Sequence, residues 1–439
     1  MRNFGVATAV ALAALGSPAF SQTSAPRPKP KSVVVTADHM LDVETGRLLD
    51  QPVVVITNGR IVAVASGSAR PAIPAGATRI DLPGKTIVPG LIDMHVHLTS
   101  NPKYGGYTGL QFTDSFWVAQ AAGNAEKTLR AGFTTVRNVG SDNYADVGLK
   151  QAIEEGWIAG PRIVPAAYAL GATGGHCDET FLPPSFQRRS PAMGDSPEEL
   201  KKRVREQRKY GAEVIKVCAT GGVFSRNTEP GVQQLHDDEL KAIADEAHFW
   251  KLKAAAHAHG AEGIKAAIRA GIDTIEHVSL IDDEGIRLAK ERGTWLGFDV
   301  YNTEYTLAEG AANGVLEENI AKERRIGTLQ RQNFAKAAKA GARMIFSTDA
   351  GIYPHGDNAR QFAVMVRFGM TPLDAIRTAT WNAAQALGRE GDVGAISVGR
   401  YGDLVAVDGD PTRDITLLER PAAVIKGGRL VAEAGAAAR

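Results

Sequence analysis

GLIDMHVH, residues 90–97, is the stretch that most clearly indicates the fold. Its apolar residues predict a buried strand that ends in two histidines spaced by one residue, His95 and His97. Side chains alternate along a strand, so both imidazoles lie on the same face. In a barrel strand that face is the interior, and the strand's end lies at the mouth where active sites are built. The pair can bind one metal ion there, although an isolated pair is about as often two ordinary polar residues.

Seven other segments are also short and apolar, and helical stretches lie between them. The eight strand candidates are residues 87–97, 133–138, 162–168, 214–220, 253–259, 274–278, 295–301 and 343–349. Alternation of strands and helices is typical of βαβ units in an α/β protein with a parallel sheet. Eight such units predict a closed (β/α)8 TIM barrel over residues 87–395.

Both ends of the chain carry a different, purely β-like pattern. Residues 22–86 contain short valine-rich runs and an Asn58-Gly59 hairpin signal, and residues 396–439 repeat this style. A chain of 439 residues exceeds the usual size of one domain. We therefore predict a small β-sandwich domain formed from both chain ends.

The first residues predict a signal peptide over residues 1–21. Arg2 supplies a positive charge, residues 6–15 form an apolar run, and residues 19–21 (Ala-Phe-Ser) offer a site for cleavage after Ser21. The apolar run is shorter than the roughly 20 residues that span a bilayer. We expect an exported protein, periplasmic or secreted, without stable membrane insertion; a membrane anchor is the alternative.

Charge and cysteine content exclude other classes of protein. The formal net charge is +1 and no basic tract is interleaved with aromatic residues, so no nucleic-acid partner is expected. Cys177 and Cys218 are too few for a disulfide framework. A single bridge between them and two buried free thiols both remain open.

Other candidate strands also end in metal-ligating residues, namely His257, His277 and Asp349. A barrel would collect these side chains and the first two histidines at one rim. Imidazole nitrogens and a carboxylate oxygen suit Zn²⁺ or a similar divalent ion.

Lys216 lies inside the apolar run of residues 214–219. A free ammonium that faces the core is costly to desolvate. Burial favours the neutral amine, which can add CO2 to become a carbamate that bridges two metals. The alternative is a lysine that points to solvent or pairs with an acid such as Glu213.

Taken together, these motifs resemble the amidohydrolase superfamily. The segments GLIDMHVH, GFTTVR (132–137), AAHAHG (255–260), IEH (275–277) and STDAG (347–351) are similar to its imidazolonepropionase-like branch. That branch includes Xaa-Pro dipeptidases, other carboxypeptidases and ochratoxin-type amide hydrolases. Arg137-Asn138 departs from the pattern, because much of the branch has Asp at the second position.

The resemblance implies a site with two divalent metal ions, expected to be Zn²⁺. It implies that His95 and His97 bind one ion and that His257 and His277 bind the other. A carboxylated Lys216 would bridge the ions. Asp349 would complete the ligands of the ion bound by His95 and His97, and it would exchange a proton with the bridging hydroxide.

Substrate contacts are also implied by the resemblance. His176, on the loop after the third strand, is similar to a histidine that polarises the scissile carbonyl, and the alternative is a surface loop histidine. His259 is expected to face the substrate, and Tyr301 is similar to a tyrosine that meets the substrate's terminal carboxylate. Arg226 can pair with an acidic substrate group or be a solvated loop arginine. His39, His236, His248 and His355 receive no role.

The predicted function is hydrolysis of the amide bond in an N-acyl amino acid, a dipeptide or a related small-molecule amide. One alternative is a cyclic-amide hydrolase of the imidazolonepropionase type. Another is a non-catalytic barrel scaffold, which would be expected to lose ligand residues. A nucleophilic serine hydrolase is not indicated, because the chain has no Gly-x-Ser-x-Gly motif. A homo-oligomer is possible.

Overall fold

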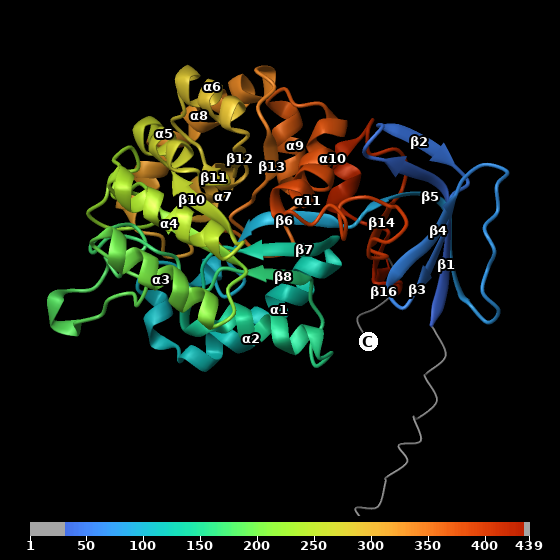
Figure 1. The fold of residues 1–439 in the computed structure, drawn as a ribbon, viewed down its shortest axis with the longest axis horizontal. Helices are drawn as coiled ribbons and strands as arrows, with labels where there is room; N and C mark the ends of the chain where they lie inside the picture. The colour runs from blue at the N-terminus through green and yellow to red at the C-terminus, as the bar shows by residue number, and fades with distance from the viewer. Residues whose placement is uncertain (1–30, 434–439) are drawn as a thin grey trace, which may run out of the picture.

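The computed structural model describes residues 31–433. The predicted signal peptide and its cleavage site lie outside these residues. Figure 1 shows a large α/β part next to a smaller sheet in which the N-terminal and C-terminal segments lie together.

The smaller part is a single sheet. Its strands are β1 (Ser32–Asp42), β2 (Arg47–Asp50), β3 (Val53–Thr57), β4 (Arg60–Ala65), β5 (Thr78–Pro89), β14 (Leu404–Val407), β15 (Ala423–Lys426) and β16 (Arg429–Glu433). They are ordered β16-β15-β14-β5-β1-β3-β4, and β2 pairs with β1. The Asn58-Gly59 signal produces the β3–β4 turn, where both residues have positive φ, 50° and 82°.

The long strand β5 joins the two ends of the chain. It runs parallel to β1 and antiparallel to β14. One apolar cluster therefore contains residues from both ends, such as Val35, Ile56, Leu404 and Ile425. The prediction that both ends build one β unit is confirmed, but the pairing is that of one continuous sheet and not of a two-sheet sandwich.

The larger part contains a strand in every one of the eight predicted ranges. These are β6 (Leu91–Val96), β7 (Phe133–Asn138), β8 (Arg162–Pro165), β9 (Val214–Cys218), β10 (Lys253–Ala258), β11 (Thr274–His277), β12 (Trp295–Phe298) and β13 (Met344–Phe346). All pairings are parallel, in a three-stranded sheet, β6-β7-β8, and a five-stranded sheet, β13-β12-β11-β10-β9.

The two parallel sheets meet at two seams. A single bridge joins Val96 to Ala350 at one seam, and another joins Leu170 to Val217 at the other. The hydrogen-bonded ladder is therefore interrupted twice, where the sequence predicted one closed ring. The strands β6, β7, β9 and β11 are buried at every residue, as expected for parallel strands covered on both faces.

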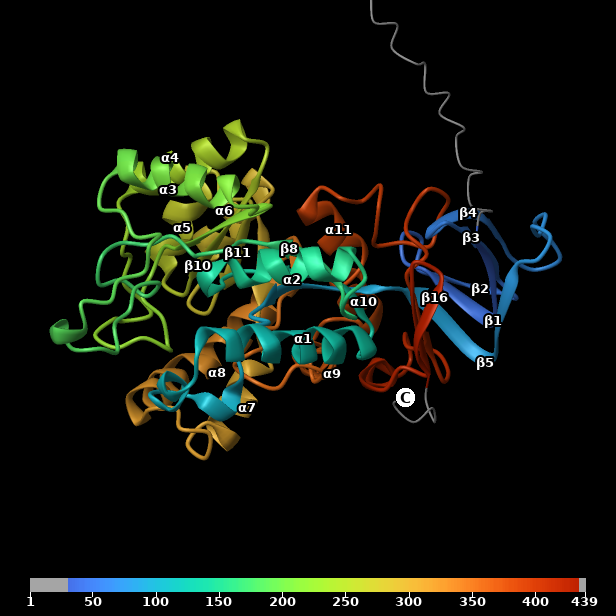
Figure 2. The same cartoon turned by 90° about the horizontal axis from the view of Figure 1, so that it is seen from below.

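Helices surround these strands, as Figures 1 and 2 show. They are α1 (Asp114–Arg130), α2 (Ala145–Glu154), α3 (Pro197–Lys209), α4 (Asp237–Phe249), α5 (Ala261–Ala270), α6 (Asp283–Arg292), α7 (Asn302–Glu309), α8 (Glu317–Lys339), α9 (Arg360–Arg367), α10 (Pro372–Thr378) and α11 (Trp381–Leu387). Short 3-10 turns cover Pro102–Tyr104, Thr108–Gln111, Asp142–Tyr144, Pro184–Phe186 and Ile415–Glu419.

Local signals set the ends of several helices. Helix α5 ends at Gly271, which adopts φ 96° and so closes the helix in the left-handed conformation that glycine favours. Pro197 begins α3 after Ser196, whose hydroxyl accepts a hydrogen bond from the Glu199 amide. Within residues 31–433, no helix combines the length and apolarity needed to cross a membrane.

Candidate metal centre and active site

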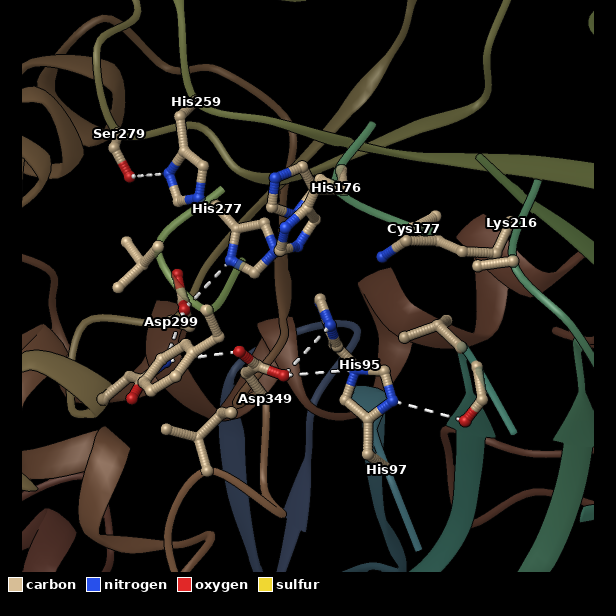
Figure 3. Close-up of a pocket in the computed structure, with 18 of the residues that line it drawn as sticks. His95, His97, His176, Cys177, Lys216, His259, His277, Ser279, Asp299 and Asp349 are labelled. Atoms are coloured by element: carbon tan, nitrogen blue, oxygen red, sulfur yellow. Dashed lines mark hydrogen bonds and ion pairs between the residues drawn. The ribbon is translucent and has the colours of Figure 1, made fainter. Parts of the chain in front are cut away.

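A cavity of about 260 Å³ opens at the carboxyl ends of the parallel strands. Its lining includes eight of the nine predicted site residues, His95, His97, His176, Lys216, His257, His259, His277 and Asp349. Figure 3 shows the histidines and Asp349 pointing toward one another across this cavity. The parallel strands collect these side chains because all of their carboxyl ends lie on one rim.

Asp349 is the centre of one donor cluster. Its Oδ1 lies 3.3 Å from His95 Nε2 and 3.3 Å from His97 Nε2. The donor atoms of His95, His277 and Asp349 all lie within 4.8 Å of one another. Nitrogen and oxygen donors at this separation suit a divalent ion such as Zn²⁺.

A second donor cluster contains His257, His259 and His277, whose donor atoms also lie within 4.8 Å of one another. His277 is common to both clusters, which places the two clusters side by side. His259, expected as a substrate contact, therefore lies close enough to act as a metal ligand.

Backbone strain is concentrated at these positions. His277, Val278 and Asp349 have φ angles of 69°, 54° and 59°. Residues other than glycine are rarely found in this region, and each such residue costs about 1–3 kcal/mol. The strands turn sharply here, and the turn aims the two ligating side chains into the cavity.

Four histidines have one ring nitrogen facing an oxygen that can only accept a hydrogen bond. His95 Nδ1 lies 3.4 Å from Glu276 Oε2, and His277 Nδ1 lies 3.0 Å from Asp299 Oδ2. His97 Nδ1 lies 3.3 Å from the Gly140 carbonyl, and His257 Nε2 lies 3.2 Å from the Gly221 carbonyl.

These acceptors determine which ring nitrogen carries the proton. At His97, His257 and His277, the nitrogen that faces the carbonyl or Asp299 acts as the N–H donor in the neutral ring, so the opposite nitrogen is the one available to a metal; at His97 that nitrogen lies beside Asp349. Hydrogen bonding of this kind is the usual support of histidine ligands. Three of the four histidines that the sequence resemblance assigns to metal binding, His97, His257 and His277, have such a hydrogen bond, whereas His95 Nδ1 faces Glu276 without forming one.

His176 and His259 have a different kind of partner. His176 Nδ1 lies 2.8 Å from Ser225 Oγ, and His259 Nδ1 lies 2.8 Å from Ser279 Oγ. A hydroxyl can donate or accept. When the serine donates, the other nitrogen of the histidine carries the proton and can donate a hydrogen bond to a substrate oxygen.

Lys216 is a buried lysine that lines the cavity. Its side chain is 3% exposed, and its Nζ has no hydrogen-bond or ion-pair partner among the described residues. Burial lowers the pKa of Lys216 to about 8, so the neutral amine is easily reached. The alternative partner, Glu213, instead pairs with Lys150 at 3.1 Å.

Three buried carboxylates support the ligands, and the sequence did not single them out. Arg137, also fully buried, donates hydrogen bonds to Glu276 and to the Met94 carbonyl. Asp93 accepts from the His95 amide at 3.1 Å and from Thr348 Oγ1 at 2.6 Å. Asp299 accepts from Gln330 and Asn302 as well as from His277. Asp93 and Glu276 stand within the motifs GLIDMHVH and IEH, and Asp299 directly follows β12, which were the signals available in the sequence.

The loop that carries His176 is fixed from two sides. Cys177 and Cys218 form a disulfide with a Cα–Cα distance of 5.8 Å, which ties the loop to the end of β9. The ring of His176 stacks on the ring of His257 with 4.1 Å between centroids. Gly222 packs against the same ring, where a Cβ would lie 2.3 Å from the imidazole. His176 is therefore half-buried and held against His257 in the cavity wall, and it is not a surface loop histidine.

Comparison with known proteins identifies the family. The model of the amidohydrolase family matches residues 86–431. The chain belongs to this family.

Similar proteins include amide hydrolases. Ochratoxinase from Aspergillus niger is 35% identical over 367 residues, which cover 78% of this chain and 75% of that protein. The crystal structure of a Xaa-Pro dipeptidase with methionine in its active site has 33% identity and a TM-score of 0.85, and the match covers 91% of this chain and 99% of that one. A prolidase complexed with N-methylphosphonate-L-proline has 32% identity and a TM-score of 0.83, over 92% and 100% of the chains. The prediction of a hydrolase acting on C–N bonds is confirmed.

The remaining predicted residues of this amidohydrolase lie away from the cavity. Tyr301 packs against Tyr353, with 4.9 Å between ring centroids, and is not among the residues that line the cavity. The chain turns into α7 at this residue, so the side chain no longer follows the strand direction. Arg226 contacts Tyr107 and Glu318, each at 2.9 Å.

Two residues that received no catalytic role support the loop after β6. Asn138 Oδ1 accepts from the Leu98 amide at 2.8 Å, and its Nδ2 donates to Asp146 at 3.2 Å. His355, which no motif indicated, is buried and donates from Nε2 to the His97 carbonyl at 3.0 Å.

Proposed function

We propose that this chain is a binuclear metal-dependent hydrolase that cleaves the amide bond of a dipeptide, an N-acyl amino acid or a related small amide. The observation that carries the proposal is the pair of donor clusters that share His277. The proposal is supported by His97, His257 and His277, in each of which one ring nitrogen faces a hydrogen-bond acceptor and the other is available to a metal.

The residues fit two divalent ions, with Zn²⁺ favoured by the nitrogen-rich donor set. His95, His97 and Asp349 would hold one ion and His257 and His277 the other, and a carbamate on Lys216 would supply further oxygen ligands. Metal ions bound there would polarise a carbonyl and lower the pKa of water toward neutrality.

The protein's own groups complete the reaction. Asp349 exchanges a proton between the water that attacks and the amine that leaves, because its carboxylate faces both His95 and His97. His176, with Ser225 as donor to Nδ1, donates from Nε2 to the scissile carbonyl oxygen. His259 lies beside His277 and contacts the substrate or the second ion.

The size and lining of the cavity support a small substrate. Beyond the polar floor, the cavity is lined by apolar side chains, Val139, Val223, Phe224, Ile326 and Ile352. A volume of about 260 Å³ is at the lower end of the range of small-molecule sites. The prolidase and ochratoxinase relatives also favour a dipeptide or an acylated amino acid.

Three further expectations belong to the proposal. The eight parallel strands act as one barrel around the site. The domain boundaries are 22–86 and 396–439 for the terminal sheet and 87–395 for the barrel. The chain is exported and is cleaved near Ser21. Outside the cytoplasm, peptides and foreign amides are available as substrates.

The test combines metal content with catalysis. Zinc per chain is measured by elemental analysis, and amino acid release is measured from a panel of dipeptides and N-acyl amino acids. Near two ions per chain, release abolished by chelation and release restored by Zn²⁺ are the expected results. A chain that binds no divalent ion and releases no amino acid would overturn the proposal. His39→Ala, a change in the terminal sheet where His39 pairs with Asp50, is the control and should leave both results unchanged.

A further inference from the structure

Helix α8 forms one wall of the cavity. Glu323, Ile326 and Gln330 lie on one face of this helix, at i, i+3 and i+7, and all three line the cavity. The turn of α8 before Glu323 is hydrogen-bonded to the loop after β9. Asn319 Nδ2 donates to the Val223 carbonyl, and Lys322 Nζ donates to the Ser225 carbonyl at 2.6 Å. The helix is thus anchored to that loop by the residues that directly precede Glu323.

Glu323 is a nearly buried carboxyl group with one oxygen unused. It is 5% exposed, and its Oε1 accepts a hydrogen bond from Thr303 Oγ1. In residues 31–433, no group donates to its Oε2 and no cation pairs with it. A carboxylate in such surroundings is costly unless a donor or a cation reaches it.

The neighbouring charges do not neutralise Glu323. Burial disfavours the ionised form of Glu323 most, and the nearby carboxylates of Asp299 and Asp349 add to this effect, so the pKa of Glu323 is raised to about 7 although Thr303 and Arg331 act against the rise. Arg331 acts on Glu323 through its charge but forms no ion pair with it, because its guanidinium is directed to the Val300 carbonyl and to Glu304 at 3.4 Å. The cavity therefore presents an acidic group for which the described part of the chain supplies no counterion.

We propose that Glu323 binds the protonated α-amino group of the substrate's acyl half. The preferred substrates are then dipeptides with a free N-terminus, and N-acylated amino acids are cleaved less well. The inference rests on the proposed function and narrows its substrate class. An ammonium suits the site because it donates hydrogen bonds and also supplies the missing positive charge. In a dipeptide this group lies one carbon from the scissile carbonyl, within the same small cavity.

The test uses substrate pairs that differ only in the ammonium. Alanyl-phenylalanine, alanyl-leucine and alanyl-proline are compared with their propionyl counterparts, in which hydrogen replaces the amino group. Wild-type enzyme is expected to prefer the alanyl member by about 10- to 100-fold in kcat/KM, the range of a hydrogen bond to a charged group. Glu323→Gln should lose most of that preference by raising KM for the alanyl substrates, with little change for the propionyl ones.

Glu318→Gln is the matched control. Glu318 lies on the same helix but pairs with Arg226 and is 41% exposed on its side chain, so the preference should be unchanged. Equal cleavage of both members by wild-type enzyme would overturn the inference and leave the amide hydrolase intact. An equal loss of kcat/KM on the alanyl and the propionyl substrates in Glu323→Gln would also overturn the inference, because it would show that Glu323 has only a structural role. No release from any substrate would instead show that the proposed function has failed. Equal cleavage by wild-type enzyme overturns the inference even where Glu323→Gln unfolds, and Glu323→Asp, which keeps the charge, should then retain the preference for the alanyl substrates.

Discussion

The candidate site has two halves that hold their histidines in different ways. The strand-built half consists of the residues at strand ends, His95, His97, His257, His277 and Asp349. In this half, carboxylates and backbone carbonyls face one ring nitrogen of each histidine. The loop-built half consists of His176 and the segment 221–228, where Ser225 contacts the histidine.

The difference shows how one site separates two tasks. An obligate acceptor imposes one tautomer and therefore creates a permanent lone pair for a metal. A hydroxyl partner leaves the tautomer open, which suits a group that must donate to a substrate oxygen. The predictions below challenge this division, beginning with the largest expected effect.

Asp349→Asn should cause the largest loss. The amide keeps the shape of the side chain but cannot take up a proton from water, so we expect kcat to fall by about 10²–10⁴-fold. Steady-state kinetics on the best substrate of the panel measures the change. Asp357→Asn, which alters a partly exposed carboxylate paired with Arg360, is the control. Activity within a few-fold of wild type would remove Asp349 from the reaction.

Glu276→Gln should weaken the strand-built half without touching the substrate. It removes the charge that faces His95 and leaves the buried Arg137 without a counterion. Loss of such support typically lowers metal affinity by about 10- to 100-fold, and an unpaired buried charge costs about 3–5 kcal/mol of stability. Competition with a chelator and urea unfolding measure the two effects.

Glu284→Gln serves as the control for that variant. Glu284 pairs with Lys265 on the surface at 3.0 Å, so zinc affinity should not change. An unchanged zinc affinity in Glu276→Gln would show that the carboxylate does not set the orientation of His95.

Ser225→Ala should affect the loop-built half alone. His176 loses its hydroxyl partner, so we expect kcat to fall by about 2- to 10-fold, the range of one hydrogen bond. Zinc content should stay at the wild-type value, because His176 is not assigned to a metal. Ser397→Ala, at a site contacted by Arg400, is the control. A loss of zinc in Ser225→Ala would move His176 into the metal-binding half.

Removal of the disulfide should have the smallest effect on catalysis. Replacing Cys177 and Cys218 by serine opens a link across 41 residues, which should lower the free energy of unfolding by about 2–4 kcal/mol. The stacking of His176 on His257 and its contact with Ser225 remain. The decrease in kcat should therefore be smaller than the decrease caused by Ser225→Ala. Urea unfolding and kinetics test this, and complete inactivation would show that the disulfide is the main support of the loop-built half.

The fold and the strand-built half were largely predictable from the sequence. The spacing of His95 and His97 required only strand alternation, and the placement of His257, His277 and Asp349 required only that parallel strands end on one rim. The predicted sandwich is not confirmed: the pairing of β5 with both β1 and β14 joins the two ends of the chain in one hydrogen-bonded sheet. Tyr301 was expected at the rim, but α7 begins there and carries its side chain toward Tyr353.

The sequence by itself determined the family, the eight strands and the type of donor at each strand end, because these depend on local periodicity and residue chemistry. Only the tertiary structure decided three other features. These are the pairing of Arg137 with Glu276 across 139 residues, the contact of Ser225 with His176 across 49 residues, and the position of Glu323 in the cavity wall. Those partners are brought together by the packing of loops and helices around the rim. No local pattern encodes such a contact, since it depends on how distant segments fill the same space.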